Sequence, residues 1–148
     1  MGGLEPVVYL SKGAKVMLTM NLWTEVGLCN GALGTVLDFV YADGQQPPCL
    51  PICVLVQFDE EYKGPSVSSV FQRCVPICPI TQVSDSMGKK YERQQLALKL
   101  AWAMTIHKCQ GLTLTKAWID LGSSERTPGI TYVALSRVKK YKIFLLSQ

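Results

Sequence analysis

The sequence predicts an α/β chain made of two segments with different hydrophobic patterns. Residues 13–84 contain short apolar runs separated by Gly, Asn, Asp and Pro turn signals, which is typical of a small β-barrel or sandwich. From residue 96 onward, strand-like and helix-like patterns alternate, which predicts a parallel α/β sheet. The length of 148 residues leaves room for one ordinary domain, or for one domain with a small insert.

In the β-rich segment we expect strands where apolar and β-branched residues cluster. They fall at residues 15–20, 34–41 and 52–58, with one or two more between 67 and 83. Asn30-Gly31 marks a tight turn between the first two of these strands. Pro76 and Pro79 suit an edge strand, because proline cannot donate a backbone hydrogen bond to a neighbouring strand. Residues 84–95 are polar and are expected to form a connector.

In the second segment the apolar pattern predicts strand, helix, strand, helix and strand in that order. Strands are expected at residues 96–104, 117–121 and 143–146, with a short helix within 105–112 and a longer one over 130–141. Thr127 and Pro128 suit the N-cap and the first residue of the longer helix. Ligands bind at the carboxyl ends of strands in such sheets, so residues 105–111 and the loop 122–128 are candidate binding segments.

The charge of the chain is unevenly distributed. Residues 1–86 hold four Lys and Arg against eight Asp and Glu, whereas residues 87–148 hold eleven against three. The net charge of +4 therefore conceals a basic C-terminal half. Such a half suggests a polyanionic partner such as nucleic acid or a nucleotide, although a solvated basic face explains the same composition.

Composition excludes several classes of protein. Hydrophobic residues make up 48% of the chain and charged residues 18%, which is too apolar for a disordered tail. No run approaches the roughly 20 apolar residues that a membrane span needs. Residues 1–6 carry neither a secretory signal nor a myristoylation signal. We therefore expect a soluble, intracellular, globular chain without a membrane partner.

The six cysteines include two C-x-x-x-C pairs, Cys49/Cys53 and Cys74/Cys78. Four thiols with this spacing can in principle hold zinc. Their neighbours read as strands rather than as the turns that structural zinc sites use, so buried free thiols are the default interpretation and no metal site is predicted. Disulfides are not expected, because nothing in the sequence suggests secretion.

Two short segments carry side chains suited to phosphate chemistry. Thr105, His107 and Lys108 lie at a predicted strand-to-helix junction, where free backbone N–H groups add further donors. An ordinary loop with one hydrogen-bonded histidine explains this segment equally well. Arg137 lies on a helix with an apolar opposite face and can project as a permanently charged fork, although a surface arginine on an amphipathic helix is the plainer alternative.

The apolar run 52–58, followed by Asp59 and Glu60, imitates the signature that holds magnesium in nucleotide hydrolases. Such a carboxylate matters only where a phosphate-binding loop supplies the nucleotide. The pattern G-x-x-x-x-G-K-S/T does not occur in these 148 residues. Asp59 and Glu60 are therefore interpreted as a turn after a strand.

Residues 98–113 and 129–137 form two longer motifs, and these resemble motifs of superfamily-one DNA helicases of the Pif and RecD type. Residues 98–113, Leu-Lys-Leu-Ala-Trp-Ala-Met-Thr-Ile-His-Lys-Cys-Gln-Gly-Leu-Thr, look like motif V of that family. Residues 129–137, Gly-Ile-Thr-Tyr-Val-Ala-Leu-Ser-Arg, look like its motif VI. Further segments that fit are 13–21, 30–36 and the aspartate-containing strand 117–122. Cys109 departs from the family, which commonly has serine there.

The resemblance implies the C-terminal part of such a helicase. Its fold would be a partial RecA-like parallel sheet lobe with an inserted small β-barrel of the Src-homology-three kind. Residues 1–95 would hold the β-rich segment with the barrel, and residues 96–148 the RecA-like segment with motifs V and VI. In the family, ATP lies between two RecA-like lobes, and the first lobe supplies the phosphate loop and the Asp-Glu pair that holds Mg²⁺.

The resemblance also implies two sets of contacts. Arg137 would be the arginine finger that stabilises charge on the γ-phosphate of ATP. Gln110 and Gly111 would face the nucleotide cleft and couple it to DNA. Backbone phosphates of single-stranded DNA would be bound without reading the base sequence. The side chains that would contact these phosphates are Thr105, His107 and Lys108.

The implied function is the C-terminal lobe of an ATP-dependent 5′-3′ DNA helicase. ATP and Mg²⁺ belong to the whole helicase, and the chain alone is expected to bind neither and to be inactive, because it lacks a phosphate loop. The expected partners are single-stranded DNA, the missing first lobe and a second copy that binds through exposed apolar lobe faces. In a eukaryote the family implies a nuclear or mitochondrial location.

Two other functions stay open at this point. One is a truncated, non-enzymatic module that binds single-stranded nucleic acid, or a relic of a mobile element with that property. The other is a structural or regulatory partner that keeps only the fold. An ATPase assay with single-stranded DNA separates an active enzyme from both.

Overall fold

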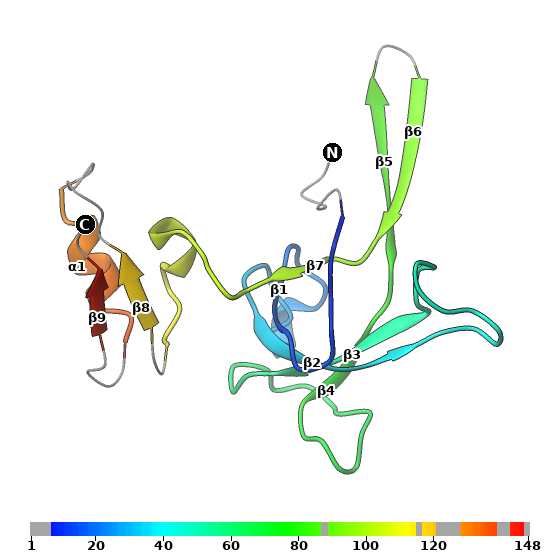
Figure 1. Cartoon of the computed structure of the whole chain (residues 1–148), viewed down its shortest axis with the longest axis horizontal. Helices are drawn as coiled ribbons and strands as arrows, with labels where there is room; N and C mark the ends of the chain where they lie inside the picture. The colour runs from blue at the N-terminus through cyan, green and yellow to red at the C-terminus, as the bar shows by residue number, and fades with distance from the viewer. Residues whose placement is uncertain (1–6, 87–88, 115–116, 121–127, 139–142, 147–148) are drawn as a thin grey trace. The chain divides into compact units, whose positions relative to one another are not determined.

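The computed structural model describes residues 7–86, 89–114, 117–120, 128–138 and 143–146. The chain divides into two compact units, Met1–Trp102 and Ala103–Gln148 (Figure 1). None of the helices in the described part of the chain is long and apolar enough to cross a membrane.

The first unit is built on a five-stranded sheet in which every neighbouring pair is antiparallel. Its strands are β1 (Lys15–Leu18), β2 (Leu33–Val40), β3 (Cys53–Phe58), β4 (Cys74–Ile77) and β7 (Leu98–Leu100). Their order across the sheet is β4-β3-β2-β1-β7, and a short 3₁₀ helix, η1 (Thr24–Val26), lies between β1 and β2 in the chain. The predicted strands at 15–20, 34–41 and 52–58 are confirmed to within two residues at each end. Pro76 lies in β4 at the edge of the sheet, as expected for proline.

The core of the first unit follows from the alternation of side chains along these strands. In β3, Val54, Val56 and Phe58 are buried, and the residues between them are only partly covered. Because successive side chains of a strand point to opposite faces, one face of the sheet is apolar and packs inward. The other buried strand residues in this cluster are Val16, Leu18, Val36, Ile77 and Leu98.

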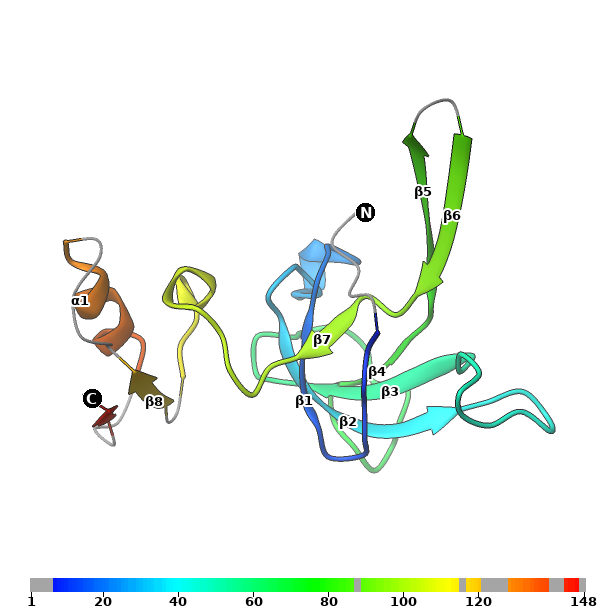
Figure 2. The same cartoon turned by 45° about the horizontal axis from the view of Figure 1, so that its top comes forward.

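A two-stranded hairpin extends from the same unit, away from the five-stranded sheet (Figures 1 and 2). It pairs β5 (Ile80–Ser86) with β6 (Lys89–Gln95) in an antiparallel register that runs from Ile80 opposite Gln95 to Ser86 opposite Lys89. The expectation that residues 84–95 form a connector is therefore wrong. The described side chains of β6 are polar on both faces apart from Tyr91, so no apolar alternation marks the strand, and cross-strand backbone pairing defines it instead.

The second unit contains a pair of parallel strands and two short helical elements. Its elements are the 3₁₀ helix η2 (Ile106–Cys109), β8 (Ala117–Asp120), α1 (Ile130–Leu135) and β9 (Ile143–Leu146). Strands β8 and β9 pair in parallel, from Ala117 beside Ile143 to Asp120 beside Leu146. An isolated parallel bridge also joins Leu114 to Val138. The predicted strands at 117–121 and 143–146 and the short helix within 105–112 are thus confirmed.

The predicted fold class, an α/β chain with a partial RecA-like parallel sheet lobe and an inserted Src-homology-three-like barrel, is wrong. The described residues are mostly β, with an antiparallel five-stranded sheet, a hairpin and one short α-helix, and they form no RecA-like parallel sheet. Parallel pairing in the described ranges is limited to β8–β9 and the Leu114–Val138 bridge. One reason is β7: the sequence pattern predicts it in the parallel sheet, but it pairs antiparallel with β1.

Two local predictions in the second segment also need correction. The strand expected over 96–104 is confined to β7, Leu98–Leu100. The helix expected over 130–141 ends at Leu135 in the described residues, and Gly129, in the left-handed region at φ 83°, occupies the position before its first turn. Pro128 precedes that glycine and is not the first helical residue. Thr127, and the loop 122–127, lie outside the described residues.

Candidate nucleic-acid and nucleotide contacts

The segment 105–111 forms a single 3₁₀ turn that displays its polar side chains. Thr105 precedes η2 in an extended conformation, and its carbonyl oxygen accepts hydrogen bonds from the N–H groups of Lys108 (2.9 Å) and Cys109 (3.3 Å). The exposed residues of the segment are Thr105, His107, Lys108, Gln110 and Gly111. The turn thus holds an ammonium group, an imidazole and a hydroxyl together in contact with solvent.

One side chain of this turn is buried and makes a hydrogen bond within the turn. Cys109 is buried, and its Sγ–H donates to the carbonyl oxygen of Ile106 at 2.9 Å. Gly111 follows with φ +81°, a left-handed conformation that favours glycine because it has no Cβ. The N–H of Leu112 donates back to the carbonyl oxygen of Cys109 at 3.0 Å, which closes the turn.

Arg137 lies just beyond the end of α1 and is half-buried. Its Nε donates to the carbonyl oxygen of Val133 at 3.3 Å, and one terminal nitrogen, Nη2, donates to Ser136 Oγ at 3.0 Å. Ser136 Oγ in turn donates to the same Val133 carbonyl oxygen at 2.9 Å. These contacts orient the guanidinium, and a cation at a helix C-terminus is favourable because the last carbonyl groups carry partial negative charge.

The backbone brings the two candidate segments together. Leu114, three residues after Gly111, donates its N–H to the carbonyl oxygen of Arg137 at 2.8 Å. The Leu114–Val138 bridge continues this pairing, and α1 also contacts η2. Segments 105–114 and 129–138 are therefore neighbours within the second unit, although more than a dozen residues separate them in the chain.

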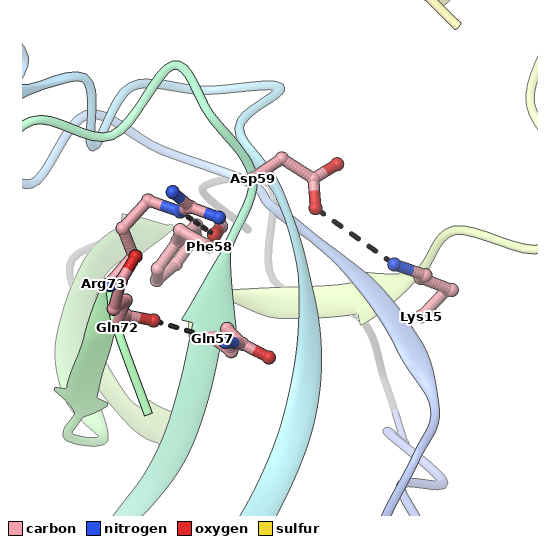
Figure 3. Close-up of polar contacts among 6 residues, drawn as sticks. All are labelled: Lys15, Gln57, Phe58, Asp59, Gln72 and Arg73. Carbon is pink, nitrogen blue, oxygen red and sulfur yellow. Dashed lines mark hydrogen bonds and ion pairs between the residues drawn. The ribbon is translucent and has the colours of Figure 1, made fainter. Parts of the chain in front are cut away.

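Asp59 lies directly after β3 in the first unit (Figure 3). Its carboxylate points toward Lys15, with Oδ1 and Nζ 3.9 Å apart. Burial raises the pKa of Asp59, and the nearby Lys15 only partly offsets that effect. Its carbonyl oxygen accepts a hydrogen bond from the N–H of Tyr62 at 3.2 Å, so the interpretation of Asp59 and Glu60 as a turn is confirmed.

Two side chains bond to backbone carbonyl groups near the end of β3 and in the segment that precedes β4 (Figure 3). Arg73 Nε donates to the carbonyl oxygen of Phe58 at 3.1 Å, and Gln57 Nε2 donates to the carbonyl oxygen of Gln72 at 3.1 Å. Among the described residues, no three His, Cys, Asp or Glu side chains group in a way that could hold a metal ion. The ion pair that the structure gives the Asp59 carboxylate is the one with Lys15.

In the described residues the six cysteines form no group that could hold a metal ion. All six are free thiols, and only Cys74 and Cys109 are buried. For the two C-x-x-x-C pairs, the expectation of buried thiols is thus right for Cys74, wrong for the exposed Cys49 and Cys78, and only partly right for the half-buried Cys53.

The hairpin carries a candidate nucleic-acid surface that the sequence predictions missed. Tyr91 and Arg93 lie opposite Ser84 and Gln82, and residues two apart in a strand share a face. Tyr91 is 46% exposed, and exposed aromatic rings near basic residues are common on surfaces that bind single-stranded nucleic acid. The sequence signal that could have revealed it is the spacing of Lys89, Tyr91 and Arg93, which are each two residues apart.

Comparison with known proteins gives one consistent result. Residues 6–39 match the family described as "DNA helicase Pif1, 2B domain". The chain is 36% identical over 137 residues to the ATP-dependent DNA helicase PIF1 of Danio rerio, covering 90% of this chain and 18% of that protein.

Solved structures agree with this comparison. The chain superposes on Bacteroides Pif1 bound to ssDNA with a TM-score of 0.63 and 28% identity, covering 97% of this chain and 30% of that one. It also superposes on Bacteroides Pif1 helicase in complex with ADP-AlF3 and ssDNA, with a TM-score of 0.60, 28% identity and the same coverage. The chain spans about 18% of the length of its curated vertebrate relatives. On these matches, the chain is a Pif1-family helicase segment that covers the 2B-domain region.

Proposed function

We propose that this chain serves as the C-terminal portion of an ATP-dependent 5′-3′ DNA helicase, where it binds the backbone of single-stranded DNA and contributes an arginine finger. One observation carries the proposal: the segments that resemble motifs V and VI lie side by side, joined by the hydrogen bond from Leu114 N–H to the Arg137 carbonyl oxygen. A motor needs such a connection, because nucleotide chemistry at one segment has to alter DNA contacts at the other.

Contact with DNA is assigned to Thr105, His107 and Lys108. All three are exposed on one 3₁₀ turn, and their hydroxyl, imidazole and ammonium groups are suited to phosphate oxygens. Contacts to phosphate carry no base information, which suits a protein that moves along any sequence. The related Bacteroides Pif1 is described as bound to ssDNA, which supports the same ligand here.

Contact with nucleotide is assigned to Gln110, Gly111 and Arg137. The guanidinium of Arg137 is held by Val133 and Ser136 at the end of α1, so it is oriented before any phosphate arrives. A permanently charged fork of this kind stabilises negative charge that builds up on a transferring phosphoryl group. The related Bacteroides helicase is described in complex with ADP-AlF3, which supports a nucleotide ligand for the whole protein.

ATP and Mg²⁺ would be bound chiefly by the first RecA-like lobe, which is the proposed partner of this chain. The chain contains no G-x-x-x-x-G-K-S/T pattern, so we expect no ATP hydrolysis from these 148 residues alone. Residues 96–148 are the proposed contribution to the nucleotide cleft, and residues 1–95 the β-rich part. For a eukaryotic source, we expect a nuclear or mitochondrial location.

The proposal includes weak self-association of the isolated chain. Trp118 and Tyr132 of the second unit are 70% and 75% exposed, and large exposed aromatic side chains favour burial against a partner. A mass by light scattering that does not change with protein concentration would contradict this part of the proposal.

The alternative is a non-enzymatic module, truncated or derived from a mobile element, that binds single-stranded nucleic acid. The two functions differ when the chain is supplied with a first lobe. A helicase portion restores DNA-stimulated ATP hydrolysis to a first lobe that contains the phosphate loop, whereas a binding module does not.

The proposed DNA contact is tested by fluorescence anisotropy with a labelled oligothymidylate. We expect affinity to fall as KCl is raised, and the combined variant Thr105→Ala, His107→Ala and Lys108→Ala to bind at least about ten-fold more weakly. Lys63→Ala is the matched control, because it removes an exposed lysine from the other compact unit. An affinity that does not change with KCl concentration, or a combined variant that binds like wild type, would overturn the assignment of these three residues to the DNA contact.

A further inference from the structure

Two cysteines, Cys53 and Cys78, lie where the β3–β4 pair ends. The register places Val54 opposite Ile77 and Leu55 opposite Pro76. One step further along the same register brings Cys53, the first residue of β3, opposite Cys78, which directly follows β4. The two thiols are also close enough to interact electrostatically, since Cys78 is one of the groups that raise the pKa of the Cys53 thiol.

Hydrogen-bonded and non-hydrogen-bonded pairs alternate along β3 and β4, and this alternation decides how close these two side chains come. Pro76 has no N–H, so the pair Leu55–Pro76 is of the non-hydrogen-bonded type. At the other end of the strands, Phe58 N–H donates to the Arg73 carbonyl oxygen at 3.0 Å. Phe58 and Arg73 are three pairs away from Leu55 and Pro76, where alternation predicts a hydrogen-bonded pair. Because the two types alternate, the Cys53–Cys78 position is again non-hydrogen-bonded.

Non-hydrogen-bonded pairs have the geometry that a disulfide needs. Their Cα atoms lie about 4.5 Å apart and their side chains are close. Disulfides span Cα–Cα distances of about 4.4–6.8 Å. The bond could therefore form between Cys53 and Cys78 without moving the strands.

Both thiols are also within reach of small reagents. Val54 and Ile77 point into the core, so the alternation of side chains places Cys53 and Cys78 on the opposite face of the sheet. Cys53 is half-buried and Cys78 is exposed. A third thiol, the buried Cys74, lies in β4 opposite Gln57.

We propose that Cys53 and Cys78 form a reversible dithiol–disulfide pair, a peroxide-sensitive modification site on the outer face of the five-stranded sheet. The Cys78 thiolate attacks one oxygen of hydrogen peroxide, so that an S–O bond forms, the O–O bond breaks and hydroxide leaves. The Cys53 sulfur then attacks the Cys78 sulfur; the S–S bond forms, the S–O bond breaks and water leaves. Overall, two thiols lose two electrons and two protons, and one peroxide is reduced to two waters.

The two cysteines take different roles in this sequence. Burial raises the pKa of the Cys53 thiol, so Cys53 is less often the thiolate that meets peroxide first. The exposed Cys78 is the entry point, and Cys53 is the resolving thiol that protects it from further oxidation. The bond joins the edge strand β4 to its neighbour β3, independently of any role in binding DNA or nucleotide.

The test uses the intact chain, treated with a small excess of hydrogen peroxide, blocked with N-ethylmaleimide and digested without reductant. We expect mass spectrometry to find a peptide pair linked through Cys53 and Cys78, two hydrogens lighter than the reduced pair and released by dithiothreitol. Oxidation should also raise the thermal unfolding midpoint, because a cross-link restricts the unfolded chain.

Three variants separate this pair from general thiol oxidation. Cys53→Ser and Cys78→Ser should each abolish the linked peptide, and Cys53→Ser should leave Cys78 as a sulfenic or sulfinic acid. Cys29→Ser is the matched control, because it removes another exposed cysteine and should leave the linked peptide unchanged. A dominant link from Cys53 to Cys49 or Cys74 in the folded chain, or no link at all, would overturn the proposal.

Discussion

The backbone N–H of Leu114 donates a 2.8 Å hydrogen bond to the carbonyl oxygen of Arg137. This bond joins the segment that follows η2 to the residue just after α1, in the described part of the second unit. It uses main-chain atoms only, so substitutions of the Arg137 side chain leave its donor and acceptor in place. The role of the guanidinium can therefore be tested separately from the connection between the two segments.

Arg137→Ala is expected to abolish catalysis in a helicase that joins this segment to a first lobe with a phosphate loop. The turnover number for ATP should fall by about 10³-fold or more, because an arginine finger stabilises charge in the transition state. Affinity for single-stranded DNA should change less than about two-fold, since the exposed turn at 105–111 is untouched. The readout is single-stranded-DNA-stimulated phosphate release.

Arg137→Lys is the control for charge. It keeps a cation near the end of α1 but loses the planar fork, so turnover should stay well below wild type. Wild-type turnover in either variant would contradict the assigned role, and turnover by the isolated 148 residues would contradict their predicted inactivity.

Lys108→Ala is expected to weaken binding of single-stranded DNA and to reduce its salt dependence. Removing one phosphate contact lowers the slope of log affinity against log salt by about one unit. The loss should be the same for oligonucleotides of different base composition, because phosphate contacts do not read sequence. Equal slopes for the variant and wild type in a KCl titration would remove Lys108 from the DNA contact.

Cys109→Ser is expected to fold and to bind DNA like wild type. The buried Sγ–H donates to the Ile106 carbonyl oxygen, and a serine hydroxyl can donate in the same direction. Cys109→Ala removes the donor and should cost about 1 kcal/mol of unfolding free energy. Urea unfolding followed by circular dichroism separates the two variants, and equal losses in both would show that volume rather than the donor matters.

Gly34→Ala is expected to destabilise the first unit by about 1–3 kcal/mol, because the strands around it have no room to spare. A Cβ at this position of β2 would lie 2.6 Å from Val56 Cγ1 and 2.8 Å from the carbonyl oxygen of Gln57. The second of these atoms belongs to the backbone of β3 and cannot rotate away. Thr35→Ala, at the next residue of β2, is the control and should lower the urea midpoint much less.

Asp59→Asn is expected to stabilise the fold slightly at neutral pH. Burial raises the pKa of Asp59 in the folded chain, so the folded state binds its proton more tightly than the unfolded state does. The contribution of the Asp59 carboxyl to folding stability is therefore favourable at low pH and is lost as the pH rises through its folded-state pKa. Thermal midpoints measured from pH 3 to pH 7 should converge at the acidic end and separate toward pH 7, with the variant higher.

Asp38→Asn is the matched opposite case. The hydrogen bond from Lys12 to Asp38 Oδ1, at 2.6 Å, and a second from the N–H of Phe39, at 2.7 Å, lower the pKa of this exposed carboxyl. The small contribution of the Asp38 carboxylate to folding stability is present above its unfolded-state pKa and is lost as the pH falls through its folded-state pKa. The variant should therefore lie slightly below wild type at pH 7, and the same shift for both variants would contradict the assigned signs.

Local pattern was sufficient for many elements of this chain. The apolar alternation of Val54, Val56 and Phe58 predicted both the strand and its inward face. Pro76 predicted an edge strand, because its missing N–H would break a ladder in the middle of a sheet. The polar residues of 105–111 were expected near a strand-to-helix junction, and they lie on the exposed 3₁₀ turn η2.

Pairing partners were beyond the reach of the sequence. Leu98 and Leu100 alternate in the same way whether their strand lies in a parallel or an antiparallel sheet, and only the register Leu18–Leu98 and Val16–Leu100 decides between them. The hairpin strand β6 could not be predicted from the sequence for a similar reason. Its polar residues give no apolar period, so the strand depends on backbone hydrogen bonds to β5.

The sequence by itself determined the short apolar strands, the exposed polar turn with Lys108 and the motifs that place the chain among Pif-type helicases. The tertiary structure decided that the fold is mostly β, that residues 89–95 are a strand and that Arg137 lies beside Leu114. The physical reason is the range of the interactions. Side-chain periodicity is set by neighbours within a few residues, whereas sheet pairing depends on backbone groups far apart in the chain, which no local pattern encodes.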